Sequence, residues 1–132
     1  MQSIINKDNI KEAYALGKNG SNDFNCCGAT LFALNKNTDL YWTSQKTMNE
    51  FLQKETEKVF NKIKIGDILA LYNKREGLLH TAVYIGRNKF FHKRGSNKAE
   101  YVTEQEIKNI YHEYESFEFR RIYLQNQLEF IF

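Results

Sequence analysis

Residues 80–92 of the chain read HTAVYIGRNKFFH, which predicts two β-strands of a hairpin with a histidine in each strand. Side chains alternate between the two faces of a strand, so His80 shares a face with the small residues Ala82 and Gly86. His92 follows by one hairpin and can lie beside His80 on the neighbouring strand. A single strand histidine is usually a satisfied core residue, but a second one can hydrogen-bond and orient the first imidazole. The pair therefore favours a functional site.

The extended pattern continues on both sides of this hairpin. The segments DILALY, LLHTAVYIG and KFFHKRG predict three antiparallel strands over residues 67–72, 78–86 and 89–95. FEFRRIYL predicts a further strand over residues 117–124. Gly, Asn or charged turn residues bound the first three segments. We therefore expect an antiparallel sheet in the second half of the chain.

The residues before the sheet have helical patterns. Asp8 can cap a first helix that runs to about Leu16. Asn25 can cap a second helix over the segment CCGATLFALN, whose apolar side predicts that it is buried. Cys26 is then the first residue of that helix.

Two capping-box patterns predict two more helices. Thr47 with Glu50 precedes helical periodicity that continues to Lys62, which is typical of a surface helix packed on a sheet. Thr103 with Glu106 opens a short helix over the segment EQEIKNIYHEY.

The order of these elements and the composition limit the fold class. Helices come first and the sheet second, which favours an α+β fold over a doubly wound parallel sheet. A chain of 132 residues is expected to form a single domain, residues 1–132. Its 42% hydrophobic and 27% charged residues exclude the disordered and membrane classes. A net charge of +3 is small for a nucleic-acid-binding protein, so no nucleic-acid partner is expected.

The sequence contains no recognisable targeting or cofactor-binding segment. The N-terminus lacks the pattern of a signal peptide, and no window approaches the roughly twenty apolar residues of a membrane span. We therefore expect cytoplasmic synthesis, with export by a specialised machine left open. The two cysteines are adjacent, so they cannot staple distant segments together. Their spacing from the histidines does not match a zinc site, and no metal or other cofactor is expected.

Cys26 is the candidate nucleophile because of its expected position. A helix N-terminus favours the thiolate and so lowers the pKa of a cysteine. Gly28 would let backbone approach a substrate, and the N–H of Cys26 can serve in an oxyanion hole. Cys27 is instead interpreted as a small buried hydrophobic residue.

A thiol, an imidazole and a polar orienting group are the three parts of a cysteine nucleophile site. Cys26, His80 and His92 are the residues of this chain that could supply them. His112 lies in a charged segment without such neighbours and is expected at the solvated surface.

The basic residues around His92 and the C-terminal tail also have expected roles. The basic residues around His92 usually form a solvated face, and they could also favour substrates that carry carboxylates; they are Lys89, Lys93, Arg94 and Lys98. The apolar tail QNQLEFIF, residues 125–132, is expected to dock on the sheet or to meet a partner.

Four motifs resemble those of the NlpC/P60 family of papain-like cysteine hydrolases. The Asp-Cys-Ser-Gly nucleophile motif of the family resembles Asn25-Cys26-Cys27-Gly28, and its Tyr-x-Trp-Gly motif resembles Tyr14-Ala15-Leu16-Gly17. Its strand that begins with Gly-Asp resembles GDILALY, and its His-x-Gly-Ile-Tyr-Ile-Gly strand with a trailing His resembles HTAVYIGRNKFFH. The likeness spans residues 11 to 95.

The resemblance implies a papain-like fold with N-terminal helices packed on an antiparallel sheet. It implies a cysteine-dependent amidase or peptidase that cuts an amide bond in a bacterial cell-wall peptide. Cys26 would be the nucleophile, His80 the general base and His92 the third polar residue. Tyr14 would be a site residue near the nucleophile. The substrate and oxyanion site would also include residues of the nucleophile motif, namely Asn25, Cys27 and Gly28.

Two alternatives remain open on the same fold. One is a secreted effector or toxin that deamidates a protein or transfers an acyl group. The other is a module that binds peptides or acyl chains without turnover. A peptide or a peptidoglycan fragment is the expected substrate, and an inhibitor or immunity protein is left open as a partner.

Overall fold

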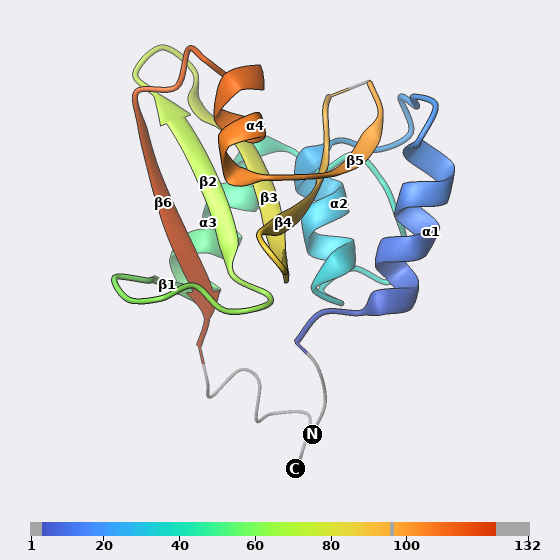
Figure 1. The fold of residues 1–132 in the computed structure, drawn as a ribbon, viewed down its shortest axis with the longest axis horizontal. Helices are drawn as coiled ribbons and strands as arrows, with labels where there is room; N and C mark the ends of the chain where they lie inside the picture. Colours follow the sequence, from blue (N-terminus) through green and yellow to red (C-terminus); the bar gives the residue numbers. More distant parts are fainter. Residues whose placement is uncertain (1–3, 96, 124–132) are drawn as a thin grey trace.

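Helices lie on both faces of one antiparallel sheet in the computed structural model, which describes residues 4–95 and 97–123 (Figure 1). The helices are α1 (Lys7–Gly17), α2 (Cys26–Ala33), α3 (Gln45–Glu55) and α4 (Glu104–Ile110). The strands are β1 (Thr56–Lys58), β2 (Ile68–Asn73), β3 (Gly77–Gly86), β4 (Lys89–Lys93), β5 (Ala99–Val102) and β6 (Ser116–Ile122). The prediction of an α+β fold with an antiparallel sheet is confirmed.

The strands lie in the order β1-β6-β2-β3-β4-β5, and every neighbouring pair is antiparallel. The four central strands, β6, β2, β3 and β4, are those that the sequence predicts. The two edge strands were not predicted. They have only three and four residues, too few to show a clear alternation of apolar and polar side chains.

The helix starts were predicted with mixed success. Asn25 caps α2 and Thr103 begins the capping box of α4, as predicted. Asn6 rather than Asp8 caps α1, because its side-chain oxygen accepts a hydrogen bond from the third residue beyond it. Ser44 rather than Thr47 caps α3.

Two helices end earlier than predicted. The helix α3 stops at Glu55 instead of reaching Lys62, because Thr56 pairs with Ile122 in the β1–β6 ladder. The helix α4 stops at Ile110, before the end of its polar segment. None of the helices within the described residues is long and apolar enough to cross a membrane. The predicted strand at residues 117–124 ends at Ile122, and the apolar tail lies outside the described residues.

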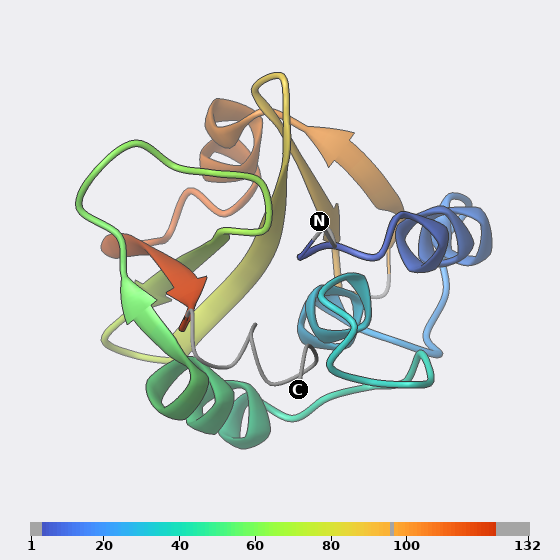
Figure 2. The same ribbon diagram turned by 90° about the horizontal axis from the view of Figure 1, so that it is seen from below.

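The sheet carries an apolar core on each face. Helices α1, α2 and α3 pack on one face, and α4 packs on the other, as the view from below shows (Figure 2). Val83 and Phe91 belong to the first core, while Ala82 and Phe90 belong to the second. The alternation of side chains predicted for the strand that contains His80 is therefore confirmed.

The pairing of β3 with β4 stops before the two histidines. The last described pair toward the histidines joins Val83 to Phe91. His80 precedes Val83 on β3, and His92 follows Phe91 on β4, so both histidines lie beyond the paired part of this hairpin. The two rings nevertheless stay in contact, since Nε2 of His80 lies 2.8 Å from Nδ1 of His92.

The N-terminal end of α2 lies against this part of β3. The buried hydroxyls of Thr30 and Thr81 are 2.8 Å apart, and the Thr81 hydroxyl donates to the carbonyl oxygen of Cys26 over 3.4 Å. Cys26 comes from the helix layer on one face, and the His80 ring belongs to the other face. Charge and hydrogen bonding from His80 nevertheless act on the thiol of Cys26.

Candidate active site

Asn25 fixes the start of α2 and ties a loop to it. Its side-chain oxygen accepts hydrogen bonds from the backbone N–H of Gly28 and of Thr43, both at 3.0 Å. Its side-chain nitrogen donates to the carbonyl oxygen of Thr43 over 2.8 Å. The same loop carries Tyr41 and Trp42, whose side chains are about half exposed, at 50% and 53%. One side chain therefore holds both Cys26 and an exposed aromatic pair in place.

Gly28 has a packing role that the sequence did not reveal. A Cβ atom at this position would overlap the backbone oxygen of Tyr41. We had expected this glycine to admit a substrate, whereas the described neighbour that needs the space is the loop. Gly28 lets the loop pack directly against the first turn of α2.

The thiol of Cys26 is partly buried and lies beside a second thiol. The two sulfur atoms of Cys26 and Cys27 are 3.8 Å apart. A hydrogen bond from Cys27 is the largest cause that lowers the pKa of Cys26; burial opposes it, while the charge and hydrogen bonding of His80 and the backbone of Thr81 assist it. Cys27 is buried, as predicted, and its pKa is raised by the same hydrogen bond and by burial. The thiolate is therefore favoured at Cys26.

His80 is buried between an aromatic ring and the other histidine. Its ring stacks on Tyr111, with centroids 4.0 Å apart, and its Nε2 atom lies 2.8 Å from Nδ1 of His92. The remaining ring nitrogen, Nδ1, is buried without a hydrogen-bond partner among the described residues. It is the nitrogen left to interact with the thiol of Cys26.

His92 connects His80 to a carboxylate. Its Nε2 atom lies 3.0 Å from an oxygen of Glu100 on β5, the residue directly opposite it in the β4–β5 ladder. Burial lowers the pKa of His92 well below its usual value of 6.5, and His80 and Arg94 act in the same direction. The ring is therefore neutral at neutral pH.

Two neighbours of the histidines were not identified from the sequence. The pairing of β4 with β5 places Glu100 beside His92, and β5 was itself not predicted. Tyr111 directly follows the last residue of α4, whereas the predicted helix continued beyond it. Burial is the largest cause that raises the pKa of Tyr111, and the charge of Cys26 acts in the same direction.

The structure places Tyr14 in the packing of α1 on β5. Its ring stacks on Tyr101, with centroids 4.7 Å apart, and it borders the core that Cys26 also borders. His112 is exposed, as predicted, and lies 3.7 Å from Glu113.

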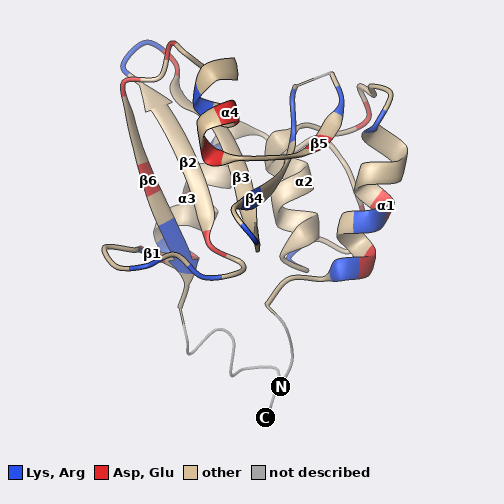
Figure 3. Ribbon diagram, viewed as in Figure 1, with Lys and Arg blue, Asp and Glu red and all other residues tan. Residues whose placement is uncertain are grey.

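The basic residues around His92 form the predicted solvated face only in part, since Lys89 and Lys98 are exposed. Lys93 is buried, and its amine donates to the carbonyl oxygen of Ser21 over 2.7 Å. Arg94 and Lys98 each lie 3.7 Å from an oxygen of Glu100. Elsewhere, basic and acidic residues are interspersed along β6 and α4 (Figure 3). The prediction that this cluster attracts carboxylates therefore loses its main support.

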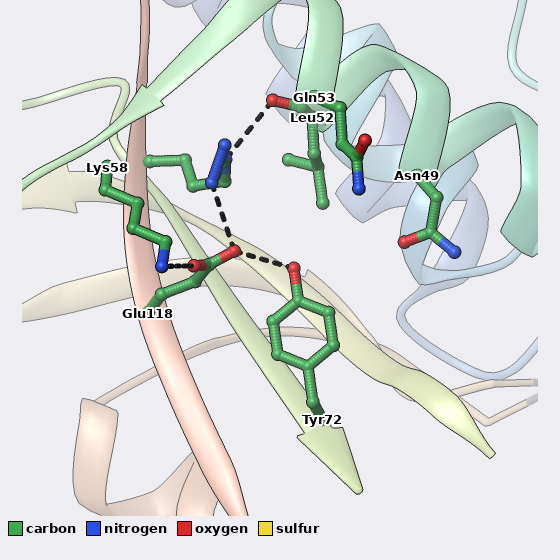
Figure 4. A pocket seen from close by; sticks show the side chains of 7 residues that line it. Asn49, Leu52, Gln53, Lys58, Tyr72 and Glu118 are labelled. Carbon is green, nitrogen blue, oxygen red and sulfur yellow. Dashed lines mark hydrogen bonds and ion pairs between the residues drawn. The ribbon is translucent and has the colours of Figure 1, made fainter. Parts of the chain in front are cut away.

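A cavity of about 450 Å³ lies away from the thiol, between α3 and the strands β1, β2 and β6. Lys58, Tyr72 and Glu118 point toward one another there (Figure 4). Glu118 accepts a hydrogen bond from Tyr72 at 2.8 Å and pairs with Lys58 and Arg120 at 3.7 and 3.3 Å. The lining thus carries two positive charges and one negative charge, and each of the three is already in an ion pair.

The arrangement around Cys26 can perform nucleophilic chemistry. It combines a thiol with a lowered pKa, the positive end of a helix, and an imidazole with a free nitrogen. A second imidazole holds the first in place. The first backbone N–H groups of a helix have no partner within the helix, and such groups can stabilise an oxyanion.

Comparison with known proteins gives two kinds of match. A model of the NlpC/P60 family matches residues 11–121. Among solved structures, NlpC1 from Trichomonas vaginalis has a TM-score of 0.55 at 14% sequence identity, over 93% of this chain and 46% of that one. An NlpC/P60 family protein from Bacillus cereus has a TM-score of 0.57 at 16% identity, over 91% of this chain and 41% of that one. The chain thus spans less than half the length of either protein. No curated protein matches it.

Proposed function

Because the chain belongs to the NlpC/P60 family, whose members are typically cysteine hydrolases, we propose that it is a cysteine peptidase or amidase with a Cys26-His80-His92 site. The observation that carries the proposal is the lowered pKa of the Cys26 thiol beside a buried pair of hydrogen-bonded histidines. Cys26 is the nucleophile, His80 the general base, and His92 the residue that orients His80.

The reaction proceeds through a thioester. The Cys26 sulfur bonds to the carbonyl carbon of the substrate, and His80 takes the thiol proton. Backbone N–H groups at the start of α2 stabilise the negative charge that develops on the carbonyl oxygen. His80 then gives its proton to the departing amine as the C–N bond breaks. It next takes a proton from the water molecule that attacks the thioester carbonyl, and it returns this proton to the Cys26 sulfur as the C–S bond breaks.

The proposed substrate is a short peptide of the bacterial cell wall. The family resemblance supports this class, and the loop held by Asn25 offers the exposed rings of Tyr41 and Trp42 beside the nucleophile. Aromatic side chains supply contact area for a peptide without adding charge. Tyr111 borders the site from the opposite face of the sheet.

Purified muropeptides test the proposal directly. The wild type and the variants Cys26→Ala and Cys27→Ser are incubated with them, and the products are followed by mass spectrometry. We expect cleavage by the wild type, none by Cys26→Ala, and much of the activity in Cys27→Ser, since serine keeps a hydroxyl donor at that position. Circular dichroism checks that each variant is folded.

Two outcomes would contradict the proposal. If the wild type leaves every muropeptide intact but deamidates or acylates a protein, the cell-wall substrate is wrong and the effector alternative replaces it. If Cys27→Ser is inactive while Cys26→Ala is active, the nucleophile is the neighbouring thiol.

A further inference from the structure

Glu100 contacts the histidine pair from the edge of the sheet. It lies opposite His92 in the β4–β5 ladder, and its carboxylate is 3.0 Å from Nε2 of that ring. We propose that Glu100 is a positioning residue that fixes which nitrogen of His80 is free to accept the proton of Cys26. This inference rests on the proposed function, since it assigns a role within the same site.

The first step concerns the position of the proton on His92. The ring is fully buried, and a neutral imidazole carries a single N–H. A carboxylate can only accept a hydrogen bond, so the short contact with Glu100 holds that proton on Nε2. The Nδ1 atom of His92 is therefore left as an acceptor.

The position of the proton on His92 also determines which nitrogen of His80 carries a proton. Because Nδ1 of His92 can only accept, the 2.8 Å contact requires that Nε2 of His80 carries its proton and donates it. Nδ1 of His80 then has a free lone pair. This is the buried atom without a partner among the described residues, and it is the one left for the thiol.

The opposite arrangement would disable the base. If the proton of His92 moved to Nδ1, that atom would donate to Nε2 of His80, and the proton of a neutral His80 would lie on Nδ1. The base would then present an N–H, rather than a lone pair, to Cys26. A wrong tautomer of this kind is known to reduce catalysis severely in triads of similar logic.

The surroundings of Glu100 keep its carboxylate in place. Arg94 and Lys98 approach it to 3.7 Å, farther than His92, so the histidine contact is the shortest of the three. The β4–β5 register places the two residues directly opposite each other. Glu100 is thus fixed by both backbone pairing and charge.

The variant Glu100→Gln tests the inference without requiring a substrate. The amide can present either its oxygen or its NH₂ group to His92, so it no longer holds the proton of that ring on Nε2, and the opposite tautomer of both rings becomes populated. Nitrogen-15 NMR of the histidine rings should show a proton on Nε2 of both His80 and His92 in the wild type, and a shift toward Nδ1 protons in the variant. The alkylation rate of Cys26 by iodoacetamide at pH 6 should fall by about tenfold or more in the variant, because its base is misdirected.

Two control variants separate this role from a loss of charge or of stability. Glu104→Gln makes the same chemical change at a carboxylate that pairs with Lys108, and it should leave the ring tautomers and the alkylation rate unchanged. Glu100→Asp keeps a carboxylate and should restore part of the alkylation rate relative to Glu100→Gln. If Glu100 only stabilised the fold, the three variants would not differ in this way in their ring tautomers and alkylation rates.

The failure of this inference differs from the failure of the proposed function. If Glu100→Gln keeps the wild-type tautomers and the wild-type dependence of alkylation on pH, the positioning role is overturned, whatever the substrate. If those measurements agree with the inference but the wild type cleaves no amide, the positioning role stands and the hydrolase assignment fails.

Discussion

The hydroxyl oxygens of Thr30 and Thr81 lie 2.8 Å apart in the buried contact between α2 and β3. Thr81 also donates to the carbonyl oxygen of Cys26. A single threonine thus links the helix that begins at Cys26 to the strand that carries His80. The distance between the Cys26 thiol and the His80 imidazole therefore depends on a polar contact inside an apolar core.

Removing one of these hydroxyls should reduce stability. Thr81→Val keeps the shape of the side chain but leaves the Thr30 hydroxyl buried without its partner, so we expect a loss of about 1–3 kcal/mol in the free energy of unfolding. Urea denaturation at pH 7 measures this loss. The double variant Thr30→Val/Thr81→Val should lose less than the sum of the two single variants. Strictly additive losses would show that the two hydroxyls are not coupled.

Cys27 should control the reactivity of Cys26. Since the hydrogen bond from Cys27 is the largest cause that lowers the pKa of Cys26, Cys27→Ala should move the midpoint of Cys26 alkylation to higher pH. Cys27→Ser is the matched control, because its hydroxyl can still donate. Iodoacetamide labelling followed by peptide mass spectrometry, between pH 5 and pH 9, provides the measurement. An unchanged midpoint in Cys27→Ala would mean that the second thiol has no such influence.

The two histidines should differ in their tolerance of substitution. His80→Asn removes the proposed general base and should lower kcat/KM by about 10²- to 10⁴-fold. His92→Asn should be tolerated better, because the amide oxygen of asparagine can still accept a hydrogen bond from His80. Kinetics on the peptide substrate compare the two variants. Equal losses would argue against separate roles for the two rings.

Burial of His92 should make the protein less stable in acid. The folded-state pKa of this ring is lowered from 6.5, so the unfolded chain takes up a proton that the folded protein excludes. Above about pH 6.5 the His92 ring is neutral in both the folded and the unfolded protein, so it does not make the free energy of unfolding depend on pH. Below that, the free energy of unfolding should fall by up to about 1.4 kcal/mol per pH unit, until the folded ring itself is protonated.

Chemical denaturation at pH values between 7 and 4 measures this slope. His92→Asn should reduce the slope, whereas His112→Asn, at an exposed histidine, should leave it unchanged. If His92→Asn has the same dependence on pH as the wild type, another buried group must be responsible.

The parts of the fold that the sequence predicted depend on local signals. Asn25 and the residues after it predict the start of α2, because an N-cap acts within one helical turn. The pairing of His80 with His92 could be predicted because a hairpin brings together residues that are near in sequence. The candidate nucleophile and its proposed partners could therefore be identified from short stretches of the sequence.

The parts that were missed depend on contacts between distant segments. The end of α3 is set by the pairing of Thr56 with Ile122, which are far apart in sequence. Lys93 looks solvated in the sequence, but its amine is satisfied by a carbonyl oxygen of Ser21. Glu100 could be placed beside His92 only once the register of an unpredicted edge strand was known.

The placement of Cys26 and His80 on different elements makes the reactive thiol a product of complete folding. Cys26 meets His80 only when α2 is docked on β3, and the unfolded chain has two ordinary thiols. Partial opening of this helix would switch off the nucleophile before the rest of the chain loses its structure. The rate of thiol labelling at low pH can therefore serve as a gauge of local opening at α2, separate from the global unfolding that denaturants report.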